Sequence, residues 1–536
     1  MKHTLMLSAL IAVSTATAAP LTQNLPAGAL VTLETHNAAS AFERLLGVVN
    51  SAASAIGFED EADEMTDGVG PLLRETLGQE AVLGVFSVGT PAGGFSPELL
   101  AVSRVGEQTR PLVTAMVKGK GAAVGRFRFV RQKDMFVGTA DDLVYLSTDK
   151  TLLMSYLARL SGRTAPRLGE SAVYTAPSRA AGEQQLGLYL NFSAMAKMVR
   201  GALAKELVPR LFSPLVDALD TLGQYAAGFT TTEQGLEAQA AHVPNAQGKD
   251  TPLYAILTHT TDFQVQRLIP ADAQSVQATA CASESNGYVG RWLTRLDLVD
   301  PTGFLTDSQL ASHLERSARY LGDECAQVTL AGNRLDQDGL SSTVTYQRVR
   351  DMAAAQAHLP EYVAALNTAI QALPDTLDSL AGAGSASLFK PAGAMSGSLQ
   401  RSTEAQLGSL KQAVSQLKLV YAFRDGYLIT AFSDQALKAA LATDQPVLAD
   451  DPAFQAAGLK MDGVGGWSYA RRPGEVSDSD LEDLLRRSND PQAAMVGALF
   501  AGGAADIINR YQGMSAQTTV NDGLILTKSS IGFTWE

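Results

Sequence analysis

The sequence repeats itself once, and this repeat limits the possible folds more than any other feature of the chain. Two strand-like apolar runs open on the triplets Leu-Pro-Ala and Ile-Pro-Ala, which begin at Leu25 and Ile269, 244 positions apart. Further short matches at the same spacing pair Gly78 with Gly322 and Arg104 with Arg348. Three matches at one spacing are hard to obtain by chance, so the pattern predicts two divergent copies of one unit.

Later matches keep their order while the spacing drifts, as expected when loops change length. They pair Asp149 with Asp434, which lie 285 positions apart, the segment 188–190 with 467–469, and Gly235 with Gly523. We therefore divide the chain into a first copy at 19–262 and a second copy at 263–536. The alternative is a single continuous sheet in which the two halves interleave.

Each copy is predicted to mix helices and strands. In the first copy, helical patterns at 38–55 and 59–76 precede strand patterns at 81–88 and 99–105. In the second copy, Asp425-Gly426 between two strand patterns is typical of a hairpin turn. Because helices come between groups of hairpins and not after each strand, we expect an α+β fold with antiparallel sheets and packed helices.

The N-terminus has the residue order of a secretory signal peptide. Lys2 precedes an apolar run at 5–13 that is too short to span a bilayer, and small residues follow it. Cleavage after Ala18 gives a mature chain that begins at Ala19, and a buried N-terminal helix is the alternative. The mature chain has no run of 18 or more apolar residues, so the sequence predicts a periplasmic or extracellular protein without a transmembrane segment.

Charge and composition exclude several classes of protein. Hydrophobic residues make up 46% of the chain and charged residues 18%, which is typical of a globular protein that buries a large core. The net charge of −13 repels nucleic acid, so no nucleic-acid partner is expected. The best candidate for a local basic patch runs from Arg126 to Arg131. Its arginines alternate with Phe127 and Phe129, which predicts a strand with one buried face, and anion or nucleic-acid binding is the alternative.

The residue types that carry metal or acid–base chemistry do not form a site in the sequence. The histidines of the mature chain are isolated from one another, and none belongs to a zinc-binding pattern. They are His36, His242, His259, His313 and His358. Acidic clusters at 59–64 and 478–483 do not match a calcium loop and predict solvated helix faces. We therefore expect neither a metal nor another cofactor.

Nucleophile and phosphate motifs are equally incomplete. Ser147 and Ser387 each precede a lysine by three positions, but this pattern has two fixed residues and arises by chance in a long chain. The segment 94–98 has Glu where a nucleophile elbow needs its last Gly. The glycines of 119–125 lack the spacing of a dinucleotide fingerprint and predict a turn. No catalytic residue is therefore assigned.

Cys281 and Cys325 are the only cysteines. In the repeat they fall opposite Asn37 and Ala81, at the end of the opening strand and the start of the next, and adjacent strands would bring them within bonding distance. An exported protein encounters oxidising conditions, so we predict a disulfide, with two buried free thiols as the alternative. Closing this loop would stabilise the fold by about 4 kcal/mol on a chain-entropy model.

Several of these features together resemble an exported bacterial family catalogued only as a domain of unknown function. The resemblance lies in the signal peptide, the Pro-Ala openings, the strand at Leu188-Tyr189-Leu190-Asn191 and the Gly-Leu pairs before the final strands. It extends through most of the mature chain and implies no catalytic residue.

The sequence therefore leads to an exported envelope protein, expected to be non-enzymatic, that presents a surface or cleft for a partner protein or an apolar ligand. Two alternatives stay open. One is a secreted hydrolase whose catalytic residues are dispersed in the sequence. The other is a structural component of a surface layer or envelope complex.

Overall fold

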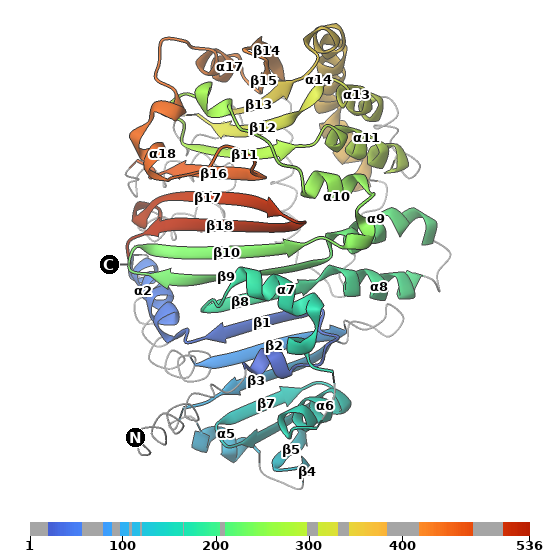
Figure 1. The fold of residues 1–536 in the computed structure, drawn as a ribbon, viewed down its shortest axis with the longest axis vertical. Coiled ribbons are helices and arrows are strands. Elements are labelled where there is room, and N and C mark those ends of the chain that lie inside the picture. Colours follow the sequence, from blue (N-terminus) through green and yellow to red (C-terminus); the bar gives the residue numbers. More distant parts are fainter. Residues whose placement is uncertain are drawn as a thin grey trace, which may run out of the picture.

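The computed structural model shows an α+β protein built on one long antiparallel sheet (Figure 1). It describes residues 20–55, 79–87, 97–106, 110–117, 121–163, 166–203, 209–296, 309–330, 342–382, 417–474 and 507–535. Within these ranges the sheet has eighteen strands, and every pairing between neighbours is antiparallel. The α+β class expected from the sequence is confirmed.

The first half of the chain supplies ten strands. Across the sheet they follow the order β4-β5-β6-β7-β3-β2-β1-β8-β9-β10. Their bounds are β1 Val31–His36, β2 Glu80–Ser87, β3 Glu98–Arg104, β4 Ala122–Val124, β5 Phe127–Gln132, β6 Met135–Ala140, β7 Leu143–Ser147, β8 Leu186–Asn191, β9 Gln224–Thr232 and β10 Gly235–Val243.

The second half supplies eight strands in the order β14-β15-β13-β12-β11-β16-β17-β18. This is the order of the first half from β6 to β10, position by position. Their bounds are β11 Ser275–Cys281, β12 Leu321–Thr329, β13 Thr343–Val349, β14 Val420–Arg424, β15 Tyr427–Ala431, β16 Gly466–Arg471, β17 Tyr511–Asn521 and β18 Leu524–Phe533.

The register of the two halves also corresponds. Thr35 pairs with Ala81, and 244 positions later Thr279 pairs with Cys325. We call two residues equivalent when they occupy the same place in this shared strand order and register. Equivalence extends to a carboxylate that accepts a backbone N–H: Glu80 accepts that of Leu21, and its equivalent Glu324 accepts that of Val265.

The halves join through their last strands. β10 pairs with β18, so the separate sheets expected from the sequence are replaced by one continuous sheet, although the strands of the two halves do not interleave. Gln239 of β10 pairs with Lys528 of β18, and these two residues are equivalent to each other. Halves related by a two-fold axis meet in this way. This pairing satisfies the backbone groups that two sheet edges would otherwise leave open.

Helices cover one face of the sheet and extend along one side of it (Figure 1). α6 and α7 pack on the first-half strands, and α8 to α14 lie beyond the strand ends. The helix bounds are α2 Ala39–Ala55, α5 Arg110–Met116, α6 Lys150–Leu160, α7 Ala172–Ala181, α8 Phe192–Leu203, α9 Pro209–Leu222, α10 Pro252–Leu257, α11 Glu284–Leu296, α13 Leu310–Ser317, α14 Met352–Gly382, α17 Asp434–Ala440 and α18 Pro452–Ala456. Short 3₁₀ turns include η1 Leu21–Asn24 and η4 Val265–Arg267.

Each half has its own core on the helix-covered face. The first-half core contains Tyr145, Tyr156 and Tyr189, and the second-half core contains Trp467 and Tyr346, all nearly or completely buried. The hairpin predicted at Asp425-Gly426 is present between β14 and β15, with positive φ at both residues, as a type I′ turn needs. The signal peptide, the helix predicted at 59–76 and both acidic clusters lie outside the described residues.

A candidate apolar binding site

The first half of the sheet is apolar on both of its faces. Successive side chains of a strand point to opposite faces, so Val82 and Val102 belong to the core while Leu83 and Ala101 face the other way. A strand buried on both faces is a continuous apolar run without alternation. β2, β3, β7 and β8 have this character in the sequence, which is the signal that the sequence analysis missed.

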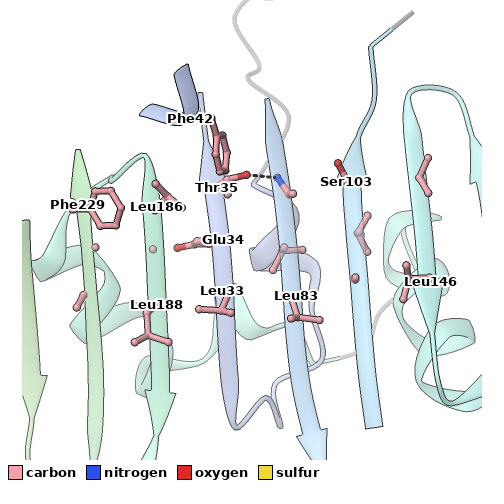
Figure 2. Close-up of a pocket in the computed structure, with 18 of the residues that line it drawn as sticks. Leu33, Glu34, Thr35, Phe42, Leu83, Ser103, Leu146, Leu186, Leu188 and Phe229 are labelled. Atoms are coloured by element: carbon pink, nitrogen blue, oxygen red, sulfur yellow. Dashed lines mark hydrogen bonds between the residues drawn. The ribbon is translucent and has the colours of Figure 1, made fainter. Parts of the chain in front are cut away.

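A cavity of about 960 Å³ lies on the face away from the core (Figure 2). Figure 2 shows Leu188, Leu33 and Leu83 next to one another on three paired strands, with Phe42 of α2 above Thr35. Leu33 is 48% exposed, although β1 is an interior strand with β2 on one side and β8 on the other. The cavity is thus a trough with a floor of aliphatic side chains that is open to an occupant.

Few polar groups of the described residues reach this cavity, and those that do already have partners. Thr35 Oγ1 accepts the backbone N–H of Ala81 at 3.1 Å, and Ser103 Oγ donates to the carbonyl of Arg104 at 2.9 Å. Glu34 also borders the cavity, but its carboxylate accepts the hydroxyl of Thr22. The described lining residues include no histidine, lysine or cysteine. An occupant of the trough meets hydrocarbon and is offered no charge partner.

Charged groups lie nearby on the core face. Arg104 Nε donates to Glu80 at 2.8 Å and Arg104 Nη1 donates to Asp142 at 2.6 Å, while His36 Nε2 lies 3.4 Å from Glu34. The hydrogen bond with Glu34, helped by the negative charges around it, raises the pKa of His36 against the effect of burial. These charges are paired with one another.

The equivalent positions of the second half are mostly polar, although Val144 is matched by Leu428, which packs with residues of α14. Leu33 and Leu83 are matched by Gln277 and Gln327, which are exposed. Further equivalent pairs, taken from the strand registers, are Ala101 with Thr345, Leu146 with Thr430, Leu188 with Ser468 and Phe229 with Thr518. The same backbone therefore carries aliphatic side chains in one half and amides and hydroxyls in the other.

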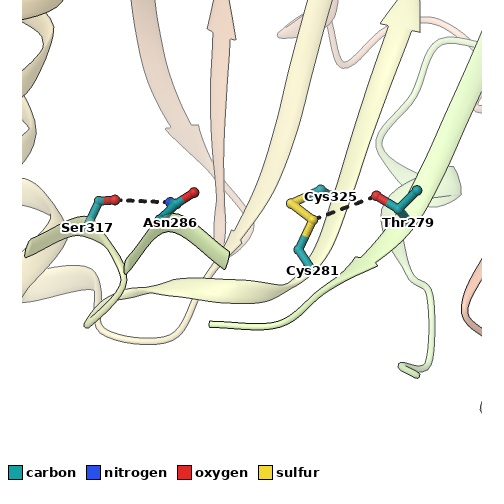
Figure 3. The surroundings of a disulfide bond; sticks show 5 residues. All are labelled: Thr279, Cys281, Asn286, Ser317 and Cys325. Atoms are coloured by element: carbon teal, nitrogen blue, oxygen red, sulfur yellow. Dashed lines mark hydrogen bonds between the residues drawn. A yellow bond between two sulfur atoms is a disulfide. The ribbon is translucent and has the colours of Figure 1, made fainter. Parts of the chain in front are cut away.

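Cys281 and Cys325 form a disulfide on adjacent strands of the second half, with 5.7 Å between their Cα atoms (Figure 3). Figure 3 shows Thr279 beside the bond, with its hydroxyl 3.7 Å from the Sγ atom of Cys281. The bond joins the strands that carry Gln277 and Gln327. The disulfide lies several strands away from the apolar trough in the sheet. It is therefore a structural element of the second half.

The other motifs singled out in the sequence have structural roles where they are described. Ser147 donates to the carbonyl of Leu99, and Asp149 caps the N-terminus of α6, so the first Ser-x-x-Lys motif is a strand-to-helix cap. Residues 121–125 form β4 and the turn into β5, and Phe127 and Phe129 of β5 are buried, as predicted. Ser387 and the segment 94–96 lie outside the described residues.

The structure brings together two histidines that the sequence analysis treated as isolated. His313 Nδ1 and His358 Nε2 are hydrogen-bonded at 2.9 Å, and Tyr320 Oη bonds the other ring nitrogen of His358 at 2.9 Å. Tyr362 stacks on both histidine rings. Burial, together with the positive charge of Arg316, lowers the pKa of both histidines. We call these two residues the histidine pair.

Among the residues that the structure describes, no group of three or more His, Cys, Asp or Glu side chains could hold a metal ion. No described helix is both long enough and apolar enough to cross a membrane.

Comparisons with known proteins add little to this description. No family model matches the chain, and no curated protein matches it. Among solved structures, it is similar to TP0453 in crystal form IV, at 12% identity and a TM-score of 0.26, covering 41% of this chain and 79% of that one. TP0453 in crystal form III gives 12% identity and a TM-score of 0.27, covering 47% and 91%. Similarity at this level does not indicate function.

Proposed function

We propose that this chain is an exported, non-enzymatic envelope protein that binds an apolar ligand in the trough of its first half. The observation that carries the proposal is the contrast between the halves. If the fold itself required aliphatic side chains on this face, the second half would need them too. It has Gln277 and Gln327 where the first half has Leu33 and Leu83.

Solvation of the trough also favours an occupant. Leaving an aliphatic surface exposed to water costs about 25 cal/mol of free energy for each Å², relative to covering it. A continuous exposed apolar patch on a protein usually marks a binding site. The trough is as large as the cavities that hold drug-sized ligands, which span about 300–1,000 Å³. These properties support ligand binding more than a role in acid–base or nucleophilic chemistry, because Glu34, the carboxylate in the described lining, is already hydrogen-bonded to Thr22.

In this proposal the chain consists of two copies of one unit, at 19–262 and 263–536. The shared strand order, the shared register and the equivalent carboxylates Glu80 and Glu324 support it. The first copy keeps the ligand site. The second copy has a polar face and extends the sheet.

Dye binding tests the proposal. We expect the neutral apolar dye N-phenyl-1-naphthylamine to bind the wild-type protein, and the double variant Leu33→Gln/Leu83→Gln to bind it at least about tenfold more weakly, because two buried leucine contacts are lost. These substitutions install the residues of the equivalent second-half positions, so thermal melting should show an intact fold.

The matched control is the reverse substitution, Gln277→Leu/Gln327→Leu, which should leave the affinity for the dye unchanged. A wild-type protein that does not bind the dye would refute the proposed function. So would a folded first-half variant that binds the dye as tightly as the wild type.

Export is tested separately. In the proposal the signal peptide is cleaved after Ala18, so the intact mass of the natively produced protein should correspond to a chain that begins at Ala19. Retention of residues 1–18 in the native protein would contradict export by this route.

A further inference from the structure

We infer that the ligand of the trough is a single linear hydrocarbon chain, such as the acyl chain of a lipid or fatty acid, lying across the strands. The inference rests on the proposed apolar binding and adds the shape of the ligand. Six adjacent strands, from β7 to β9, each contribute two side chains that are two positions apart, and Ala238 of β10 borders the trough next to β9. The pairs are Val144 and Leu146, Ala101 and Ser103, Ala81 and Leu83, Leu33 and Thr35, Leu186 and Leu188, and Ala227 and Phe229.

This arrangement fixes the proportions of the trough. Strands lie about 4.8 Å apart, so the distance from β7 to β9 is about 24 Å. Side chains two positions apart on a strand are separated by about 7 Å. Spread over that floor, the cavity volume of about 960 Å³ corresponds to a layer about 6 Å deep. Nonbonded carbon atoms pack at about 4 Å, so the trough holds one layer of hydrocarbon.

A long, narrow and shallow trough selects among apolar ligands. An extended alkyl chain advances by about 1.25 Å per carbon, given C–C bonds of about 1.5 Å, so a trough of this length holds about 18 carbons. A fused ring system is shorter and wider, and would leave much of the floor uncovered. A peptide would bury backbone N–H and C=O groups against a lining that offers them almost no partner.

The trough also defines the position of the polar head. The polar side chains of the described lining are already hydrogen-bonded: Thr35 and Ser103 bond to the backbone, and Glu34, which is negative, accepts the hydroxyl of Thr22. A charged carboxylate or phosphate would lose its hydration in the trough without compensation. The head group therefore stays in solvent at an end of the trough, and affinity depends on the length of the tail more than on the chemistry of the head.

A displacement series tests the inference. Saturated fatty acids of about 8 to about 20 carbons are titrated against the bound naphthylamine dye, with alkyl alcohols of the same lengths and a sterol beside them. We expect affinity to rise by up to about fourfold for each methylene group, the full value of burial, and to level off near about 18 carbons. Alcohols should show the same dependence of affinity on chain length as the acids, and the sterol should compete weakly with the dye.

The two proposals fail in different ways. If the dye does not bind the wild-type protein at all, the proposed function is wrong and the inference falls with it. If the dye binds but affinity is independent of chain length, or the sterol competes as well as the longest acid, the linear-chain inference alone is overturned.

A plug at one end of the trough makes the test specific. Leu146 lies on β7, the outermost of the six strands on that side. Leu146→Trp should block about one strand spacing and shorten the best tail by about four carbons. The matched control Thr430→Trp, at the equivalent second-half position, should leave the optimum unchanged.

Thermal melting shows whether the Trp variant folds, and Leu146→Phe serves as the smaller plug if it does not. A folded plug variant with the optimum of the wild type would overturn the inference. So would a shift produced equally by Thr430→Trp.

Discussion

The outer faces of the two halves differ in chemistry while their backbones correspond. In the first half Leu33 pairs with Leu83 and Leu188, and in the second half Gln277 pairs with Gln327 and Ser468. The fold is therefore compatible with either kind of face, because its core lies on the opposite side of the sheet. The difference shows that the side chains on the outer face can change without changing the strand order or register.

The halves also differ in how their strands are held together. Cys281 and Cys325 cross-link β11 and β12. In the first half the equivalent residues are Asn37, directly after β1, and Ala81 in β2, and they form no such link. The covalent link stabilises the second half by restricting its unfolded chain.

The largest predicted effect is the loss of this link. Cys281→Ser/Cys325→Ser should lower the free energy of unfolding of the second half by up to about 4 kcal/mol, because it reopens a 44-residue loop in the unfolded chain. Hydrogen exchange during denaturant unfolding measures the two halves separately: protection should fall in β11 to β13 and stay unchanged in β1 to β3.

Thr279→Ala, next to the bond, is the control and should have little effect, since the Thr279 hydroxyl contributes only a weak contact to sulfur. If quantitative alkylation labels both cysteines in the unfolded, unreduced protein, the bond does not form. Equal loss of protection in both halves would show that the halves do not unfold separately.

Local structure could largely be predicted from the sequence. Alternation located β5, and turn residues located the hairpin at Asp425-Gly426, since both signals depend on neighbouring residues. The spacing of 244 gave the correct register from Thr35 and Thr279 to Arg104 and Arg348. Within this range, the strands of the two halves are strictly in step.

Beyond this range the sequence alignment was wrong by one residue. Asp149 was matched with Asp434, but the residue that caps the equivalent helix is Ser433. Likewise, Tyr189 is equivalent to Tyr469, one position from the match made in the sequence. Ser and Asp cap helices equally well, so capping chemistry does not require the same residue in both halves. Once loop lengths differ, short motifs of this kind cannot fix the register.

The single sheet could not be predicted from the sequence either. It depends on β10 and β18, which lie almost 300 residues apart and join through backbone hydrogen bonds. Backbone groups are the same in every residue, so this pairing has no sequence signature. The histidine pair was missed for a related reason: His313 and His358 lie on separate helices, α13 and α14, and only the tertiary packing brings them together.

The apolar trough, in contrast, did have a sequence signal. β2 and β3 are apolar at consecutive positions, whereas their equivalents β12 and β13 alternate, as in Thr343 to Gln347. Comparing the two halves for loss of alternation would have shown which half has a second apolar face.

The smallest predicted effect separates the halves by their response to pH. Glu34 raises the pKa of His36 in the first half, so protonated His36 stabilises the folded state. This contribution is fully present below the unfolded-state pKa of about 6.5 and is lost as the pH rises through the folded-state value. For the histidine pair the sign is opposite: burial lowers both pKa values, so its contribution is present above about 6.5 and is lost as the pH falls.

Acidification from about pH 8 to about pH 5 should therefore weaken hydrogen-exchange protection in α13 and α14 while protection in η1 and β1 is kept or increased. The charges that face the histidine pair are Arg316 on α13 and Glu361 on α14, whose side chains lie 3.4 Å apart. Because Glu361 is paired with Arg316, its carboxylate is not free to balance a new positive charge on the histidines.

His358→Gln keeps a hydrogen-bonding side chain and removes the ionisation of that ring, and it should reduce the acid response of the second half. His36→Gln is the matched variant and should affect only the first half. If both halves lose protection equally on acidification in the wild type, the opposite signs assigned to these histidines are wrong.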